Sequence, residues 1–588
     1  MVSTKHWKYP ENEDIVLNAL RGLAATNPTI RLIPSERVVY RPTEHKNKVA
    51  VISGGGAGHE PLHSGFVGEN LLDAAVSGSI FASPSTKQIM AAVKATAKKE
   101  HGALIVVKNY TGDILHFGLV AERAKRDGID VELVVVSDDV AVGRTQNEMV
   151  GRRGLAGTAL VHKIVGAASN TGASLAELTE LGKKVNSLLA TMSASLARTS
   201  VPGRKAEEDD QDDENTAELG LGIHNEPGEK IDIPEIRNLV QTLYDRILDP
   251  KDKERHYLEI EDEDEYVLLI NNIGGTSSLE LYAITHFLLE GCPLKKKPSR
   301  ILVSDFVTSL NSPGFSLTIM NLSKLSTSVF SQSQILLFLD LETDAPGWKP
   351  KTYDQKAWEE VRKDEGSSED HAKVPHSSLK VDGEKFASAL QKAMDSVIEK
   401  EPLITKYDTL VGDGDCGETL KNGATGILEA LKNDSEFRKN INDPVATLSA
   451  VTEIVEDKMG GTSGGLYAIY LTSLVKNLSN ASEISSSVVA EAIYDALYDG
   501  LFKYTKAREG GRTLVDTLQP FANTLKETGD LSSLVEAARK GCKNTAELHA
   551  KFGRASYVSE EDFKKEGGIP DPGAVGLLAL IEGFTSLY

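Results

Sequence analysis

The chain has 588 residues and a formal net charge of −21. A chain this long exceeds what one hydrophobic core usually supports, and its acidic charge disfavours binding to nucleic acid or to a membrane surface. Three widely spaced cysteines, Cys292, Cys416 and Cys542, form no CxxC motif. They predict neither a disulfide framework nor a zinc site. We see no secretory signal and no run long enough to span a bilayer, so we expect a cytoplasmic protein.

Strand-like and helix-like segments alternate in the first half of the chain. Apolar β-branched runs before residue 140 occupy 48–53, 103–108 and 131–136, and helical periodicity marks 86–100. This βαβ rhythm predicts a mostly parallel sheet covered by helices. A second group of predicted strands comprises 266–271, 300–306 and 335–340. We therefore expect an α/β domain with two lobes over residues 1–345.

The composition changes twice further along the chain. The acidic run AEEDDQDDEN (206–215) predicts a solvated loop, and the Pro-, Gly- and Ser-rich stretch 346–380 predicts an interdomain linker. Residues 381–588 show apolar residues at helical spacing and almost no strand signal, which predicts an all-α bundle of roughly eight helices. The clearest helical segments are 384–400, 419–432, 463–475, 485–504 and 571–584.

Three loops in the N-terminal half carry candidate site residues. SGGGAGHEP follows the strand 48–53, and its third Rossmann glycine position is His59, so a small ligand is expected there rather than a dinucleotide. VVKNYTGD places Lys108 and Asp113 after the next strand, where lysine can bind a hydroxyl and aspartate can accept its proton. His224 lies in the loop GLGIHNEPGE, and its imidazole could add to a carbonyl. Each residue alone is more often a surface or capping residue.

The segment YDTLVGDGDCGETL (407–420) holds three carboxylates, Asp408, Asp413 and Asp415. Gly412 and Gly414 allow a tight turn, and clustered carboxylate oxygens suit Mg²⁺. An EF-hand loop counted from Asp413 fails, because its fifth and sixth positions do not match the pattern. A solvated acidic turn remains the alternative.

Two further glycine-rich loops stand at predicted helix starts. KMGGTSGGLY (458–467) could form an anion-binding nest, although it lacks the lysine of a P-loop and could equally be a hairpin between packed helices. REGGRTLVDTL (508–518) offers Arg512 and Thr513, with a surface arginine as the alternative. The sequence does not show whether these loops meet at one end of the bundle.

Six motifs follow one another over nearly the whole chain: SGGGAGHEP, VKNYTGD, GLGIHNEPGE, Asp-x4-Asp-Gly-Asp, MGGTSGG and DPGA. In these motifs and their order, the chain resembles the dihydroxyacetone kinase family in its single-chain, ATP-dependent form. The resemblance implies an N-terminal ketose-binding K domain over 1–345, a linker over 346–380 and a C-terminal L domain over 381–588. The L domain is expected to be an eight-helix barrel that binds ATP. Members of this type are usually homodimers.

The resemblance also implies roles for individual residues. His224 is expected to form a covalent hemiaminal with the substrate carbonyl, with Asp113 and His59 as further catalytic residues. The implied substrate-binding residues are Gly56, Ala57, Gly58, His59, Lys108, Asp113 and His224. The implied metal ligands are Asp408, Asp413 and Asp415. The implied nucleotide-binding residues are Asp413, Gly414, Asp415, Cys416, Thr462, Ser463, Arg512, Thr513, Asp571, Pro572 and Gly573.

The activity implied is phosphorylation of dihydroxyacetone, and of D-glyceraldehyde to its 3-phosphate, with ATP and Mg²⁺. Two local departures, Ala57 for a frequent serine and Asn225 for a frequent glycine, remove no reactive group. Two other functions stay open. Animal relatives also split FAD to cyclic FMN, and some bacterial relatives act as regulators rather than enzymes.

Overall fold

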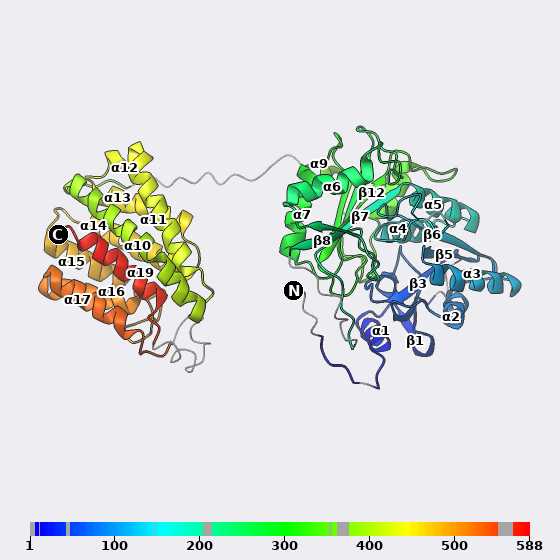
Figure 1. Ribbon diagram of the computed structural model, residues 1–588, viewed down its shortest axis with the longest axis horizontal. Helices are drawn as coiled ribbons and strands as arrows, with labels where there is room; N and C mark the ends of the chain where they lie inside the picture. Colours follow the sequence, from blue (N-terminus) through cyan, green and yellow to red (C-terminus); the bar gives the residue numbers. More distant parts are fainter. Residues whose placement is uncertain are drawn as a thin grey trace. The chain divides into compact units, whose positions relative to one another are not determined.

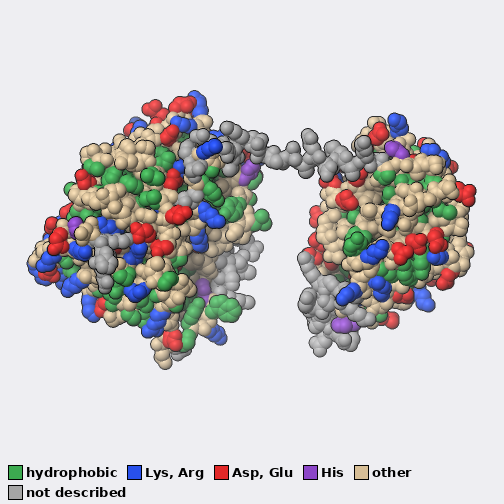
Figure 2. All heavy atoms as spheres, turned by 180° about the vertical axis from the view of Figure 1, so that it is seen from behind, with side chains coloured by type: hydrophobic (Ala, Val, Ile, Leu, Met, Phe, Trp, Pro, Cys, Tyr) green, Lys and Arg blue, Asp and Glu red, His purple; other side chains and the backbone are tan. Residues whose placement is uncertain are grey.

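The computed structural model describes residues 6–10, 12–42, 47–146, 149–203, 215–351, 353, 355–360, 375–550 and 568–588. The acidic run 206–214 and much of the stretch 346–380 lie outside these residues. Contacts divide the chain into two compact units, Met1–Gly366 and Ser367–Tyr588, which are described separately below (Figure 1). On the face of each unit seen in Figure 2, acidic and basic side chains are interspersed.

Unit 1 contains two six-stranded sheets. The first has the order β1-β2-β4-β3-β5-β6, in which β3 pairs in parallel with β4 and β5, and β5 pairs in parallel with β6. The parallel sheet predicted from the βαβ rhythm is therefore present here. Its strands are β1 (Arg31–Ile33), β2 (Val38–Tyr40), β3 (Ala50–Ala57), β4 (Ala74–Ile80), β5 (Ala103–Lys108) and β6 (Val131–Val136).

The second sheet has the order β11-β10-β12-β7-β8-β9 and is mainly antiparallel. Only β10 and β11 pair in parallel, across the crossover through α7. The sequence did not indicate this, because periodicity reports burial of a strand and not the direction of its neighbour. Its strands are β7 (Leu189–Ser195), β8 (Thr216–Leu219), β9 (Glu229–Asp232), β10 (Tyr266–Asn272), β11 (Arg300–Ser304) and β12 (Gly314–Asn321).

Helices fill the space between the sheets and cover their outer faces. Buried residues of α4 and α5 share one core with Val106 of the first sheet and Leu269 of the second. The opposite face of the first sheet packs on α2 and α3, and that of the second on α6 and α7 (Figure 1). The helices are α1 (Ile15–Thr26), α2 (Thr86–Thr96), α3 (Thr111–Arg126), α4 (Gly157–Ser169), α5 (Leu175–Ser187), α6 (Ile236–Leu248), α7 (Ser278–Glu290), α8 (Gln332–Asp340) and α9 (Gln355–Glu360).

The prediction of a strand over 335–340 was wrong, because these residues belong to α8. Ser331 caps this helix and forms a reciprocal capping box with Gln334. Ile335 and Phe338 are buried, whereas Leu337 is 56% exposed, which is helical rather than alternating burial. A short apolar run does not by itself distinguish a buried strand from a helix, and the cap decides here.

The described part of unit 2 is helical throughout, so the predicted fold class, an α/β region followed by an all-α domain, is confirmed. Eight of its helices have ten residues or more: α10 (Gly383–Val411), α11 (Cys416–Asn433), α13 (Pro444–Lys458), α14 (Gly461–Ser479), α15 (Ser486–Asp495), α16 (Val515–Thr528), α17 (Leu531–Asn544) and α19 (Pro572–Thr585). A short α12 (Ser435–Lys439) lies between α11 and α13, and a π-turn (Ala496–Gly500) with a 3-10 turn (Leu501–Lys503) follows α15.

The apolar faces of these helices form the core of unit 2. Ile404, Leu420 and Ala579 lie in one buried cluster, which joins α10, α11 and α19. None of the helices in the described residues is both long and apolar enough to cross a membrane.

Candidate active site

Two histidine side chains contact each other in unit 1. The His59 side chain is fully buried, and its Nδ1 lies 2.8 Å from the carbonyl oxygen of Thr308. Its Nε2 lies 3.0 Å from Nε2 of His224, which is contributed by the β8–β9 loop. Nδ1 of His224 lies 3.1 Å from a carboxylate oxygen of Glu226. The structure thus brings together two residues that are 165 positions apart in the sequence.

The backbone of the β8–β9 loop is held tightly. The Gly222 N–H donates to the carbonyl of Glu226 at 2.9 Å, which closes the turn around His224. Asn225 has a φ of 65°, a region that suits glycine and, among other residues, asparagine best. Its side chain also bonds the backbone N–H and C=O of Thr199, at 3.0 and 3.1 Å. The departure from glycine at this position is therefore compatible with the turn.

A second buried group stands at the end of β5. The Lys108 ammonium is 1% exposed and donates to Nε2 of His63 at 2.9 Å. Nδ1 of His63 lies 2.8 Å from the Ser53 hydroxyl, which donates to the carbonyl of Val106. Since Lys108 can only donate, His63 must carry its proton on Nδ1 and be neutral. These consecutive hydrogen bonds fix the position of the Lys108 side chain.

Asp113 lies in the first turn of α3 and faces the same place. Its carboxylate accepts a hydrogen bond from Ser83 at 2.5 Å, and the side chain is 4% exposed. A Cβ on Gly55 would lie 3.2 Å from Lys108 Nζ and 3.4 Å from Asp113 Oδ2. The lysine and the aspartate therefore converge on the backbone of the glycine-rich strand end, as the sequence predicted for this edge.

The other glycine-loop residues shape the backbone near His59. A Cβ on Gly56 would meet the backbone of Ala82 at 2.7 Å, so only glycine fits. Ala57 is buried, and its carbonyl accepts from Phe81 N–H at 2.9 Å. Gly58 has a φ of 103°, which other residues rarely adopt. These residues set the path of the loop that carries His59.

Burial controls the protonation of this site. It lowers the pKa of His59 well below its usual value, and Lys108 and His224 lower it further. Burial also lowers the pKa of Lys108, against the opposing charge of Asp113. Although burial raises the pKa of Glu226, its hydrogen bond with His224 and the charge of His224 outweigh this, and the value is about 2. Glu226 is thus ionised at neutral pH.

In unit 2, the three predicted metal ligands come together at the α10–α11 turn. One oxygen from each of Asp408, Asp413 and Asp415 lies within 4.8 Å of the others. Asp408 is buried and accepts from the Cys416 N–H at 2.9 Å, whereas the other two are exposed. A Cβ on Gly412 would lie 2.2 Å from the Asp408 carboxylate. The oxygen-only donor set fits Mg²⁺.

The glycine loop before α14 lies beside these carboxylates. Ser463 in the first turn of α14 lies 3.9 Å from the Sγ of Cys416, and Thr462 is exposed next to it. Burial raises the pKa of the Cys416 thiol to about 12, with Asp408 adding to the effect. A Cβ on Gly464 would lie 1.8 Å from the Met459 carbonyl, so this loop requires glycine there.

The loop before α16 is organised by buried polar groups. The Arg512 side chain is 1% exposed and donates to the carbonyls of Thr545 and Ile569, at 3.2 and 2.7 Å. The alternative of a surface arginine is therefore excluded. Asp516 accepts from the N–H groups of Gly510 and Thr513, at 2.6 and 2.8 Å. Arg512 thus ties this loop to the start of α19.

Asp571 caps α19 by accepting from Ala574 N–H at 2.8 Å, while Pro572 starts the helix and Gly573 follows it. Burial raises the pKa of Asp571 to about 6; Arg512 lowers it, and Asp408 raises it further. These charge interactions mean that the α10–α11, α16 and α19 loops meet at the same end of the bundle. The sequence alone had left this open.

Two buried or charged groups in unit 1 were not singled out from the sequence. His63 comes four residues after His59, and Glu226 two residues after His224, so each lay close to a residue already chosen. Only the fold shows that His63 holds Lys108 and that Glu226 faces the imidazole of His224.

Family models match both units. The Dak1 domain matches residues 21–338, and the DAK2 domain matches residues 410–586. An α/β unit of the first kind and a helical unit of the second on one chain define a two-domain enzyme. The chain belongs to the dihydroxyacetone kinase family, as its motifs predicted.

The similarity extends over the whole length. A dihydroxyacetone kinase of Komagataella pastoris is 48% identical, with 100% of this chain and 99% of the relative covered. A triokinase/FMN cyclase of Mus musculus is 34% identical, over 97% and 96%. A crystal structure of the dihydroxyacetone kinase from C. freundii in complex with AMP-PNP and Mg²⁺ has 30% identity and a TM-score of 0.65, with 99% of both chains covered.

Proposed function

We propose that this enzyme transfers the terminal phosphoryl group of ATP to dihydroxyacetone, and also to D-glyceraldehyde. The observation that carries the proposal is the contact between the buried His59 and the part-buried His224, near Lys108 and Asp113. Its support is twofold. Relatives named dihydroxyacetone kinase and triokinase align over the full chain, and a related enzyme binds AMP-PNP and Mg²⁺.

His224 is proposed to hold the substrate through its carbonyl. A neutral imidazole nitrogen can add to an electrophilic carbonyl carbon, and the resulting hemiaminal fixes the position of the hydroxyl to be phosphorylated. Nε2 of His224 faces His59, while its Nδ1 is engaged by Glu226. Nε2 is therefore the nitrogen proposed to form the tether, with Nδ1 held by Glu226.

Asp113 is proposed to accept the proton of the reacting hydroxyl, with His59 assisting. The convergence of Asp113 and Lys108 near Gly55 supports this, because a lysine can hold an oxygen atom while a carboxylate takes its proton. Gly55 places no side chain between these two groups, where a Cβ would already be in close contact with both. A polyol without a carbonyl could not form the tether.

In unit 2, Asp408, Asp413 and Asp415 are proposed to bind Mg²⁺, with the glycine loop at α14 and the turns at Arg512 and Asp571 surrounding the nucleotide. Bound Mg²⁺ would supply charge neutralisation of the phosphate oxygens. The chain's own contribution is to hold three carboxylates together and to offer backbone N–H groups at helix starts. The domain limits 1–345, 346–380 and 381–588, the homodimer and the cytoplasmic location are proposed on the resemblance; light scattering tests the homodimer.

The tether is tested by His224→Ala. The KM for dihydroxyacetone should rise about tenfold or more, which corresponds to loss of about 1.4 kcal/mol, while nucleotide binding to unit 2 stays intact. His286→Ala, which removes an exposed histidine of α7, is the matched control. An unaltered KM in the His224 variant would contradict the tether.

A second activity is suggested by the relatives named triokinase/FMN cyclase. The same carboxylates could hold a metal at the diphosphate of FAD. Incubation with FAD and Mn²⁺ tests this: cyclic FMN appears if the activity is present, and unchanged FAD excludes it.

A further inference from the structure

The hydrogen bonds of the two histidines leave their Nε2 atoms facing each other. Nδ1 of His59 faces the Thr308 carbonyl and Nδ1 of His224 faces a carboxylate, so both Nδ1 atoms carry hydrogen. In two neutral rings neither Nε2 atom then carries a proton. The 3.0 Å contact between them is a hydrogen bond only when one of the two also binds a proton. A pair that shares such a proton carries one positive charge.

Glu226 is placed to complement this charge. One carboxylate oxygen lies 3.1 Å from Nδ1 of His224, and the other accepts from the His224 backbone N–H at 3.0 Å. The same side chain thus fixes both the backbone and the ring of the histidine. An amide could not reproduce both bonds, because its NH₂ group would meet a donor.

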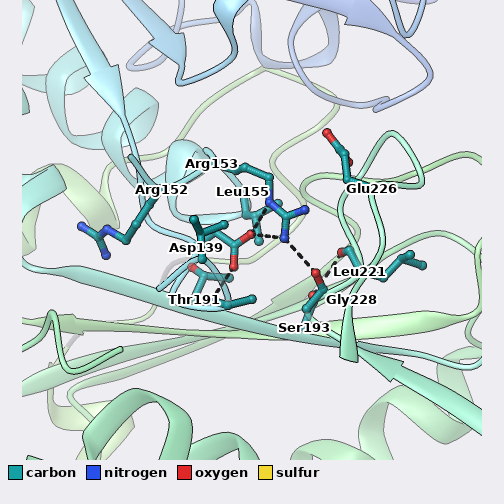
Figure 3. Close-up of polar contacts among 12 residues, drawn as sticks. Asp139, Arg152, Arg153, Leu155, Thr191, Ser193, Leu221, Glu226 and Gly228 are labelled. Carbon is teal, nitrogen blue, oxygen red and sulfur yellow. Dashed lines mark hydrogen bonds and ion pairs between the residues drawn. The ribbon is translucent and has the colours of Figure 1, made fainter. Parts of the chain in front are cut away.

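Arg153 holds the loop that carries Glu226. Arg153 donates to Asp139 at 2.7 Å and to the Gly220 carbonyl at 2.8 Å. Figure 3 shows it between Asp139 and the loop with Leu221 and Glu226. A Cβ on Gly222 would lie 2.0 Å from Glu226 Oε2 and 2.5 Å from Arg153 Nη1. Arg153 and Glu226 therefore both pack against the position that a Gly222 side chain would occupy, and only glycine fits there.

We propose that Glu226 is a positioning residue for His224: it holds the imidazole with Nε2 directed at the substrate carbonyl and stabilises the positive charge that the ring carries once the adduct has formed. The inference rests on the proposed tether. It adds a residue whose role in that step is to orient the reacting ring and to stabilise its charge.

Addition of His224 to the carbonyl conserves atoms and charge. The lone pair of His224 Nε2 forms a C–N bond to the carbonyl carbon, and the π bond of the carbonyl breaks onto oxygen. The shared proton stays on His59 and passes from there to that oxygen, which becomes a hydroxyl. His59 ends neutral. The positive charge moves to the substituted ring of His224, whose Nδ1–H still donates to Glu226.

Other titratable groups lie around the two histidines. Tyr110 at the start of α3 packs edge-on against His224, with ring centroids 4.7 Å apart. Lys108 acts electrostatically on His59, and Glu226, Arg153 and Asp139 act on Tyr110.

The test uses the full chain without nucleotide and dihydroxyacetone labelled with carbon-13 at its carbonyl. In the wild type, NMR should show a protein-bound signal in the sp³ region, which His224→Ala abolishes. At equal ketose concentration, Glu226→Gln should reduce this signal about tenfold or more, comparable to the loss when a carboxylate that orients a metal-binding histidine is removed. Glu226→Asp, which keeps the charge, should recover part of it.

Kinetics distinguish positioning from a loss of loop structure. In Glu226→Gln the ketose KM should rise more than kcat falls, because the imidazole is no longer held in the orientation for addition to the carbonyl. Glu218→Gln is the matched control, since Glu218 accepts from the N–H of the loop residue Gly228 at 3.0 Å. It should lower stability and leave the ketose KM unchanged.

The results of these experiments distinguish the tether at His224 from the positioning role of Glu226. Absence of the sp³ signal in the wild type would overturn the tether itself. A wild-type signal and a wild-type ketose KM in Glu226→Gln would overturn the role of Glu226 and leave the tether standing. If Glu226→Gln does not fold, Glu226→Asp, with its carboxylate withdrawn by about 1.5 Å, must still show a weaker signal than the wild type.

Discussion

The two candidate sites of this protein differ in how their charged groups are held. In unit 1, His59, Lys108 and Asp113 are 0, 1 and 4% exposed, and each has a hydrogen-bond partner. In unit 2, Asp413 and Asp415 are exposed and converge with Asp408 into a group of like charges. The first site is preorganised by the protein alone. The second gathers charge that a cation would neutralise.

This difference predicts opposite responses to the removal of charge. Deleting a buried carboxylate that accepts hydrogen bonds leaves its donors without a partner and destabilises the fold. Deleting a carboxylate from a group of like charges relieves repulsion. Replacing a carboxylate by its amide should therefore lower the folding stability of unit 1 at its candidate site. In the absence of metal, the same change among the three aspartates should raise the folding stability of unit 2.

The largest effect is expected for Asp413→Asn combined with Asp415→Asn. The kcat should fall about 10³-fold or more, because electrostatic stabilisation of the phosphoryl group is lost. The melting temperature of the metal-free protein should rise. A coupled ADP-release assay and calorimetry measure the two quantities.

The control is the exposed pair Asp395→Asn and Asp499→Asn, which removes the same charge from elsewhere in unit 2. It should leave kcat near the wild-type value. If the Asp413 and Asp415 changes lowered the melting temperature of the metal-free protein, the proposed difference between the two candidate sites would be contradicted.

A smaller effect is expected at Asp571. Its pKa is about 6 in the folded protein against 3.8 ordinarily, so the folded state binds this proton more tightly. Its contribution to stability is full below about pH 4 and is lost as pH rises through about 6. Asp571→Asn keeps the helix cap and should make unit 2 more stable at pH 7 by about 1–3 kcal/mol, but not at pH 4. Urea unfolding at the two pH values measures this, and an equal difference at both would contradict it.

The smallest effect is expected at the cap of α8. Ser331→Ala should lower the stability of unit 1 by about 1 kcal/mol and leave nucleotide binding by unit 2 unchanged. Ser333→Ala, inside the same helix, should be neutral or stabilising, since alanine favours helices. If Ser333→Ala lowered the stability more than Ser331→Ala, the helix would not depend on its Ser331 cap.

Most elements could be predicted because their sequence patterns are local. The runs 103–108 and 131–136 coincide with β5 and β6, and the helical periods of the C-terminal half correspond to α10, α11, α14, α15 and α19. The antiparallel direction of the second sheet was not predicted, because strand direction depends on neighbours far along the chain. The helix over 332–340 was missed because its cap, Ser331, lies outside the apolar run.

The candidate sites show the same division. Glycine-rich turns and clustered aspartates pointed to Asp408, Asp413 and Asp415, which the fold brings together. The contact between His59 and His224 spans 165 residues and is not encoded in any local pattern. Nor did the sequence show that Arg512 is buried, because a guanidinium inside a loop resembles a surface one until its carbonyl partners are known.

The most direct test of the account compares dihydroxyacetone with glycerol in an ADP-release assay with ATP and Mg²⁺. The two differ at the central carbon, where only the ketose has a carbonyl for His224 to capture. We predict rapid ADP release with dihydroxyacetone and near-background release with glycerol. Comparable rates with both would contradict capture through the carbonyl.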